Sequence, residues 1–154
     1  MRNFENIYID GAWIPSGGSG TIEVINAATE QVMGSIPDGV ASDVDSAVSA
    51  ARTAFDAWSQ TPVEERQKYL TRLNEALQAR SAEIAETIAG EVGMPITWST
   101  MIQAGLPVGN MATFATLLDS FEFEQEIGNS LIVKEPVGVV GAITPWNYPL
   151  HQII

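Results

Sequence analysis

The chain has 154 residues, of which 45% are hydrophobic, and this is enough for one domain with a buried core. Nineteen acidic and seven basic residues give a formal net charge of -12, so electrostatic repulsion disfavours nucleic acid and anionic membranes as partners. The sequence contains no cysteine, which excludes disulfides, thiolate metal sites and a cysteine nucleophile among these residues.

The first residues do not have the pattern of a targeting segment. Residues 1–6 lack the apolar core of a signal peptide. No apolar run approaches the roughly 20 residues that are needed to span a bilayer. We therefore expect a cytoplasmic protein without a membrane partner.

Short strand signals fill the first 36 residues. Asp10 and Gly11 lie between two β-prone runs, residues 7–9 and 12–14, and this pattern is typical of a tight hairpin whose turn residues are left-handed. Residues 21–25 and 31–36 are predicted to form two more strands, separated by polar and glycine-rich turns.

The hydrophobic period then changes to three- and four-residue steps, which predicts an amphipathic helix over residues 43–58. Ser42 and Asp45 have the spacing of a capping box at its start. Tryptophans are large apolar side chains that usually lie inside a protein or at the edge of its core. We expect this of Trp13, Trp58 and Trp98.

Two further helical stretches follow. The first is predicted to begin with Thr61 as N-cap and Pro62 as its first residue, and to continue to about Gly90. The second covers residues 98–118, again with helical spacing of its apolar residues. Pro107 lies inside it, so we expect either one long bent helix or two short ones.

The last 34 residues contain two strand-like segments. Residues 121–134 are predicted to form a second hairpin around Gly128 and Asn129. Residues 137–143 are apolar without alternation, as expected of a strand that is covered on both faces in a parallel sheet. Because the chain stops in an apolar segment without a cap or a polar tail, we expect it to be incomplete.

The loop after Ile143 is the candidate functional segment. Ligands of open α/β sheets bind beyond the carboxyl ends of the strands, and this loop would lie there. Asn147 lies between Pro145 and Pro149, whose rings restrict the backbone, so its amide is a candidate fixed donor to an oxyanion. On composition alone, the stronger interpretation is a rigid turn whose asparagine caps its own backbone.

Residues 135–149 read Glu-Pro-Val-Gly-Val-Val-Gly-Ala-Ile-Thr-Pro-Trp-Asn-Tyr-Pro, which resembles, almost residue for residue, the aldehyde dehydrogenase signature around the catalytic asparagine. The other motifs follow in family order, from residues 8–13 to residues 91–95, so the resemblance covers essentially the whole chain. It implies an α/β fold, namely the N-terminal part of a Rossmann-like nucleotide-binding domain with an oligomerisation hairpin. Residues 1–120 would supply the first hairpins and helices, 121–135 the oligomerisation hairpin, and 136–154 the first core strand and the cofactor and oxyanion loop.

The resemblance also implies an activity, the oxidation of an aldehyde to a carboxylic acid with NAD or NADP through a cysteine thioester. Asn147 matches the family asparagine whose amide binds the oxyanion. The stretch that lines the cofactor cleft is matched by Ile143, Thr144, Pro145 and Trp146. The family's nucleophile and general base fall beyond Ile154, so we expect these 154 residues alone to be inactive, and we expect no metal site.

The hairpin of residues 121–135 looks like the family's oligomerisation arm, and it would make the full-length protein a homodimer or homotetramer by strand addition. A merely solvated hairpin is the other interpretation. Two alternatives to the enzyme remain open. One is a non-catalytic assembly module that pairs through this hairpin. The other is a different dinucleotide-binding oxidoreductase, although residues 138–141 lack its Gly-x-Gly-x-x-Gly fingerprint.

Overall fold

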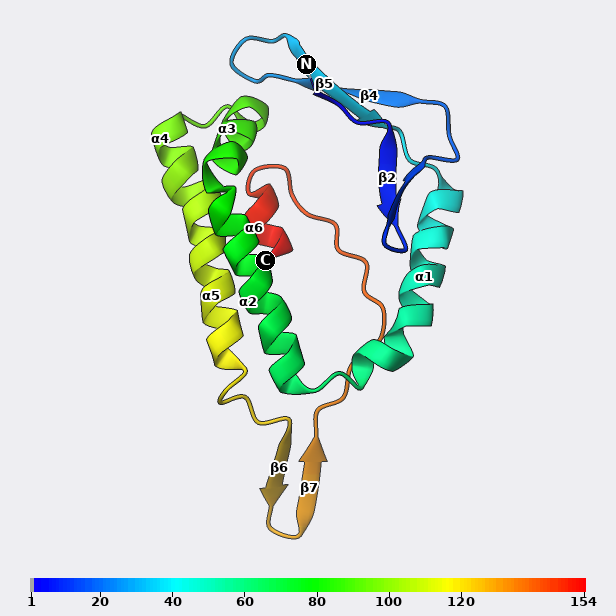
Figure 1. The fold of residues 1–154 in the computed structure, drawn as a ribbon, viewed down its shortest axis with the longest axis vertical. Coiled ribbons are helices and arrows are strands. Elements are labelled where there is room, and N and C mark those ends of the chain that lie inside the picture. The colour runs from blue at the N-terminus through cyan, green and yellow to red at the C-terminus, as the bar shows by residue number, and fades with distance from the viewer. Residues whose placement is uncertain (1) are drawn as a thin grey trace.

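The computed structural model describes residues 2–154, which form a β-layer at one end, a layer of helices, and a hairpin that projects at the other end (Figure 1). A three-stranded sheet has the order β1-β5-β4. Its strands are β1 (Arg2–Asn3), β4 (Thr21–Ile25) and β5 (Val32–Pro37). The helices are α1 (Ala41–Ser59), α2 (Val63–Ala79), α3 (Ser81–Val92), α4 (Ile96–Trp98), the π-helical stretch η1 (Ser99–Gly105), α5 (Leu106–Leu117) and α6 (Pro149–Ile153).

The first predicted hairpin is confirmed. It consists of β2 (Asn6–Ile9) and β3 (Ala12–Pro15), which pair in antiparallel register. Its turn residues Asp10 and Gly11 have φ values of 51° and 77°, the left-handed values that a two-residue turn requires. The strands predicted at residues 21–25 and 31–36 are also confirmed, as β4 and β5.

Strand β1 was not predicted from the sequence. It pairs in parallel with β5, so that Arg2 lies opposite Gly34. A Cβ atom at Gly34 would collide with the backbone carbonyl of Arg2, and only glycine allows this approach. The pairing therefore depends on one small residue that lies more than thirty positions away along the chain.

Helix α1 is confirmed, but its predicted capping box is wrong. The helix begins one residue after Val40, and Asp43 rather than Ser42 or Asp45 supplies the capping side chain. The Oδ2 atom of Asp43 accepts a hydrogen bond from the backbone N–H of Val40 at 3.0 Å. The helix starts upstream of the predicted box, where the Asp43 carboxylate binds the backbone N–H of the N-cap residue Val40.

The second helical stretch is divided into α2 and α3, and its predicted N-cap is also wrong. Pro62 itself occupies the N-cap position, with φ -56° and ψ 150°. The hydroxyl of Thr61 instead donates to the carbonyl of Ala57, at 3.4 Å, in the last turn of α1. Arg80 separates α2 from α3, and α3 ends at Gly93 in the left-handed conformation, a common helix terminator.

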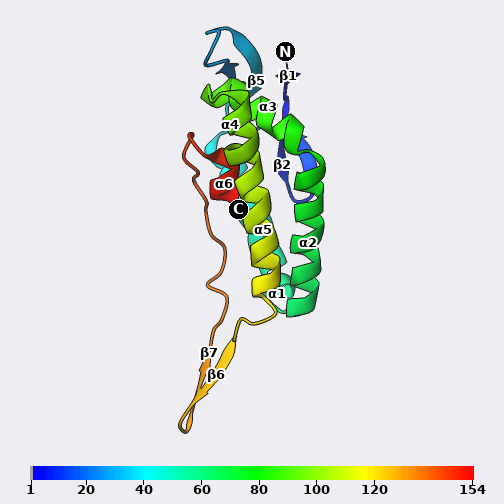
Figure 2. The ribbon, with the colours of Figure 1, turned by 90° about the vertical axis from the view of Figure 1, so that its left-hand side faces the viewer.

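The third helical run is continuous from α4 through η1 to α5, which confirms one of the two forms that were expected around Pro107. Proline conflicts with the carbonyl four residues earlier in an α-helix, here that of Gln103. The wider π-helical turns of η1 precede Pro107, which is fully buried. Figure 2 shows this run as one column beside α2.

The core lies where α2, α3, η1 and α5 meet. Its buried apolar side chains include Ala85, Ile88, Ala104, Met111 and Ala115, and small residues let these helices approach closely. Polar contacts add to this packing, because Ser99 Oγ donates to the carbonyl of Ala85 at 2.7 Å.

Much apolar surface remains exposed. The accessible area is 11019 Å², whereas a monomeric protein of 16.5 kDa typically exposes about 7500 Å². The expectation that the tryptophans lie in or beside the core is wrong for the described residues, since Trp13, Trp58 and Trp98 are 65%, 50% and 54% exposed. Trp13 instead packs edge-on against Tyr8, with ring centroids 5.2 Å apart.

The strand predicted over residues 137–143 is not formed in the described chain. This segment runs as an unpaired coil from the second hairpin towards α6 (Figure 1). A strand would place Val137 and Val140 on opposite faces, and they are 92% and 70% exposed, so neither face is covered. A parallel strand exists only when neighbouring strands pair with it, and no strand among residues 2–154 pairs with this segment.

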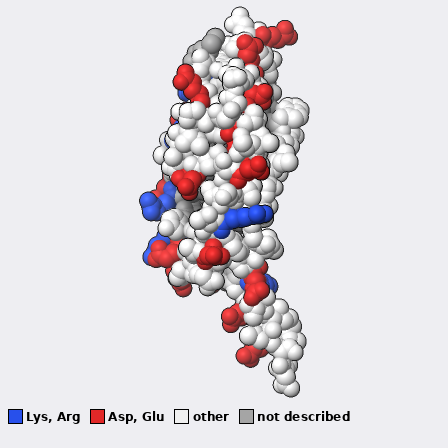
Figure 3. All heavy atoms as spheres, turned by 90° about the vertical axis from the view of Figure 1, so that its right-hand side faces the viewer, with Lys and Arg blue, Asp and Glu red and all other residues white. Residues whose placement is uncertain are grey.

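The second predicted hairpin is confirmed. It comprises β6 (Glu124–Ile127) and β7 (Ser130–Val133), with Gly128 at a φ of 62° in its turn. Every residue of both strands is exposed, and the hairpin projects away from the helices in both ribbon views (Figures 1 and 2). On the face beside α1, acidic side chains are spread along the molecule with few basic ones (Figure 3). The negative charge is therefore distributed rather than gathered into one site.

Candidate functional site

The predicted site residues lie on the loop that leads into α6. Ile143, Thr144, Pro145, Trp146 and Asn147 are all exposed, and Trp146 is 78% exposed. The structure therefore brings them together as one continuous open surface and does not enclose them.

The side chain of Asn147 is free to act on another molecule. Its amide makes no hydrogen bond to any of the residues 2–154, so it does not cap its own backbone as a simple turn asparagine would. Tyr148 is the N-cap residue of α6, and its carbonyl accepts the N–H of Gln152 at 3.1 Å. Asn147 thus stands one residue before the N-cap of α6, with an unused neutral donor.

The backbone of Asn147 is held from the helical layer. Gln103 Nε2 donates to the Asn147 carbonyl at 2.8 Å. Gln103 lies on η1 and is completely buried. Its other polar atom, Oε1, is also buried and has no hydrogen-bond partner within the described chain.

Sequence reasoning missed Gln103. The available signal is a polar residue between Ile102 and Ala104 in an apolar helical run. Glutamine usually lies on the solvent side of a helix, and only the packing of η1 against its neighbours shows that Gln103 is buried. His151, for which no role was expected, packs edge-on against Tyr148, with ring centroids 6.4 Å apart.

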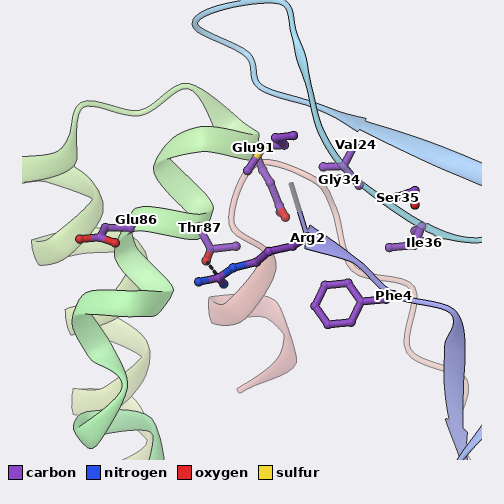
Figure 4. Close-up of a pocket in the computed structure, with 10 residues that line it drawn as sticks. Arg2, Phe4, Val24, Gly34, Ser35, Ile36, Glu86, Thr87 and Glu91 are labelled. Atoms are coloured by element: carbon purple, nitrogen blue, oxygen red, sulfur yellow. Dashed lines mark hydrogen bonds between the residues drawn. The ribbon is translucent and has the colours of Figure 1, made fainter.

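A separate hollow lies between the N-terminal strands and α3 (Figure 4). Arg2 reaches across it and donates to Thr87 Oγ1 at 3.4 Å and to Glu83 Oε1 at 3.5 Å. Arg80 holds the same Glu83 at 2.9 Å, and this hydrogen bond and charge are the main reason why the pKa of Glu83 lies below its ordinary value. The arginine therefore joins the sheet to α3, which indicates a structural junction.

Among residues 2–154, no group of three or more histidine, cysteine or acidic side chains is placed to hold a metal ion. None of the helices in this range is both long and apolar enough to cross a membrane. The loop before α6 therefore remains the candidate functional site.

Fold and site together define a class of protein. It is an α/β chain in which a loop beside the helical layer carries an asparagine between two prolines. The sequence model of the Aldehyde dehydrogenase family matches residues 13–154, and the chain belongs to this family. The resemblance and the α/β fold class predicted from the sequence are thereby confirmed.

Curated relatives support the same assignment. A 3-succinoylsemialdehyde-pyridine dehydrogenase from Pseudomonas sp. is 42% identical over 154 residues, which are 99% of this chain and 32% of that protein. A putative aldehyde dehydrogenase from Staphylococcus haemolyticus is 40% identical over 152 residues, with the same coverage. The chain thus spans about a third of the length of the curated relatives it matches.

Solved structures have the same fold over this span. Aldehyde dehydrogenase C from Pseudomonas syringae, solved as a mutant with NAD+ and octanal, superposes with a TM-score of 0.94 at 39% identity, covering 97% of this chain and 31% of that one. An aldehyde dehydrogenase from Bartonella henselae superposes with a TM-score of 0.95 at 31% identity, covering 99% of this chain and 33% of that one. A Mycobacterium tuberculosis aldehyde dehydrogenase solved with NAD+ superposes with a TM-score of 0.92 at 34% identity, covering 98% of this chain and 32% of that one.

Proposed function

We propose that these residues supply the oxyanion-binding loop of an oxidoreductase that converts an aldehyde into a carboxylic acid with NAD or NADP. The observation that carries this proposal is the exposed amide of Asn147, which has no partner among residues 2–154 although its backbone carbonyl is bound by Gln103. A donor that is unused in the resting structure and whose backbone is held in place suits a charge that develops only during the reaction.

The chemistry assigns Asn147 one role. When a thiolate adds to the carbonyl carbon of an aldehyde, the π electrons move to the oxygen, which becomes an oxyanion. The Asn147 amide would donate a hydrogen bond to this oxygen and so lower the barrier. When the carbonyl re-forms, the hydrogen on the same carbon leaves as a hydride, and the product is a thioester that water hydrolyses. The thiolate must come from outside these residues, which contain no cysteine.

The neighbouring loop residues suit a nicotinamide cofactor, which would accept the hydride when bound. Ile143 and Trp146 are 100% and 78% exposed and offer apolar and aromatic surface. Small-molecule sites are lined mainly by such side chains, with a few polar groups between them. Relatives from Pseudomonas syringae and Mycobacterium tuberculosis were solved with NAD+. We therefore assign cofactor contacts to Ile143, Thr144, Pro145 and Trp146.

The projecting hairpin supports a second function, assembly into a homodimer or homotetramer. In β6 and β7, Ile127, Leu131, Ile132 and Val133 are between 43% and 58% exposed. An exposed apolar strand pair with free edges is suited to strand addition by another chain. This observation also supports the alternative of a non-catalytic assembly module, which would pair through the same hairpin but would not turn over an aldehyde.

The test is the Asn147→Ala variant in a family-length polypeptide that contains these residues. We expect kcat to fall by about 10²- to 10³-fold, because the oxyanion loses a donor, whereas the Kd of the nicotinamide cofactor stays unchanged. Asn6→Ala, which alters an exposed asparagine on β2, is the matched control and should keep the parental kcat.

An aldehyde deuterated at its carbonyl carbon establishes whether hydride transfer limits turnover. If it does, and the Asn147→Ala variant keeps the parental kcat, the oxyanion role is wrong. If the parent protein oxidises no aldehyde but still self-associates, the assembly module is favoured instead.

A further inference from the structure

We infer that Gln103 is the positioning residue of the oxyanion loop, acting on the reaction only through Asn147. This inference rests on the proposed function of Asn147. The observation behind the inference is the 2.8 Å hydrogen bond from Gln103 Nε2 to the Asn147 carbonyl, which joins two residues 44 positions apart.

Prolines restrict the loop on both sides of the peptide that Gln103 holds. Pro145 and Pro149 have fixed φ angles, and proline disfavours the helical region for the residue before it. The peptide unit between Asn147 and Tyr148 is planar. A hydrogen bond to its carbonyl oxygen therefore sets the orientation of that plane, and with it the direction in which the Asn147 side chain leaves the backbone.

The burial of Gln103 indicates that its amide has a purpose other than filling space. The side chain is completely buried, and its Oε1 atom has no partner among residues 2–154. Burying a polar atom without a hydrogen bond is unfavourable, and an apolar side chain of similar volume would avoid the penalty. The Gln103 amide makes a contact to the Asn147 loop that an apolar side chain could not make.

The π-helical stretch provides the rigid base for this contact. Single π turns within α-helices occur frequently at functional sites. Here η1 carries Gln103 and packs against both α3 and α6. Ser99, in the same stretch, is also fully buried, but its hydroxyl binds the carbonyl of Ala85 on the side of α3. One π-helical stretch thus carries two buried polar side chains, of which only Gln103 is bonded to the loop.

The experiment is a double-mutant cycle in the family-length polypeptide, with Gln103→Leu, Asn147→Ala and the combination. We expect Gln103→Leu to lower kcat by about tenfold or more, since small displacements of a catalytic group lower rates steeply. The KM values for aldehyde and cofactor should change far less. In the Asn147→Ala background, Gln103→Leu should have little further effect on kcat.

The matched control is Ser99→Ala, which removes the other buried hydrogen bond of η1. It should lower the melting temperature and leave kcat unchanged. Gln103→Glu is the second variant if the Gln103→Leu protein does not fold, because glutamate fills nearly the same space as glutamine. Its ionised carboxylate cannot donate to the Asn147 carbonyl, whereas its protonated form can, so its kcat relative to the parent should recover as the pH falls.

The two proposals fail in distinguishable ways. If Asn147→Ala lowers kcat but neither Gln103 variant does, the positioning role is wrong and the proposed function stands. If Gln103→Leu lowers kcat equally in both backgrounds, Gln103 does not act through Asn147. If Asn147→Ala itself leaves kcat unchanged while hydride transfer limits turnover, the proposed function fails, and the positioning role fails with it.

Discussion

The carboxylate of Asp43 accepts a hydrogen bond from Ser16 Oγ at 2.6 Å and so ties the loop after β3 to the first turn of α1. The same carboxylate accepts the backbone N–H groups of Gly17 at 2.9 Å and Val40 at 3.0 Å. The hydrogen bond from Ser16, followed by those from Val40 and Gly17, holds the pKa of Asp43 below its ordinary value of 3.8. Three donors converge on one carboxylate at the junction between the β-layer and the helices.

The first prediction concerns Asp43→Ala. A carboxylate whose pKa is lowered by folding stabilises the folded state above its unfolded pKa, and this contribution is lost as the pH falls through the lower folded value. The variant should therefore melt at a lower temperature than the parent at neutral pH. The difference should shrink as the pH falls below the ordinary value of 3.8. Thermal melts across this pH range measure it.

Asp45→Ala is the control for this prediction. Asp45 is exposed, and its carboxylate makes no hydrogen bond to the described part of the chain. The control should change the melting temperature less than Asp43→Ala at neutral pH. A difference between Asp43→Ala and the parent that stays constant down to strongly acidic pH would contradict the assignment.

The second prediction compares two glycines of the third helical run. A Cβ atom at Gly109, within α5, would meet no atom within 4 Å. Gly109→Ala should therefore raise the free energy of unfolding by about 0.5 to 1 kcal/mol, because alanine loses less backbone entropy in a helix. A Cβ atom at Gly105, at the end of η1, would lie 3.1 Å from the carbonyl oxygen of Thr100.

Gly105→Ala should stabilise less than Gly109→Ala, or should destabilise, because the Thr100 carbonyl must move. Denaturant unfolding of both variants gives the comparison. Equal stabilisation by the two alanines would show that the Thr100 carbonyl is not held close to position 105.

The third prediction tests assembly through the outer edge of β7. The N–H of Lys134 donates to the Phe123 carbonyl, and N–H groups alternate between inward and outward along an antiparallel strand. With the register that pairs Leu131 with Glu126, the N–H of Leu131 points outward. Proline is tolerated at such a position, where it removes a donor without breaking the hairpin.

Leu131→Pro should therefore shift a family-length oligomer towards smaller species in analytical ultracentrifugation. Leu131→Ala, which shortens the side chain but keeps the outward N–H, separates the backbone contribution from the apolar one. If the proline variant keeps the parental assembly, strand addition at this edge is ruled out.

Local turn and helix signals were predicted well because their causes are local. Asp10 and Gly11 have the left-handed φ values that a two-residue turn requires. The helix end predicted at about Gly90 lies two residues later, at Val92, where Gly93 is left-handed. The caps of α1 and α2 were predicted less well. Neither N-cap residue, Val40 or Pro62, has a polar side chain, and the capping carboxylate of α1 comes instead from Asp43 inside the first turn.

Long-range features were beyond sequence reasoning. The apolar composition of residues 137–143 indicates a segment that would be covered, but a strand also needs a neighbour, and none pairs with it among residues 2–154. The pairing of Arg2 with Gly34 likewise depends on chain folding rather than on local pattern. At the candidate site, the family motif points to Asn147, while Gln103 has no motif of its own and emerges only from packing.

The π-helical stretch also bears on how this chain tolerates changes in length. A π turn contains one residue more than an α turn, so it can be regarded as a helix that has accommodated a single inserted residue. Deleting one residue from Ser99–Gly105 would allow ordinary α-helix to re-form. Because the wider turn holds the extra residue locally, the side chains on either side of the stretch would keep their faces after such a deletion. A deletion within ordinary α-helix would instead rotate them by about 100°. Ser99–Gly105 is therefore the part of this helical run that can change in length by one residue while the segments on either side keep their orientation.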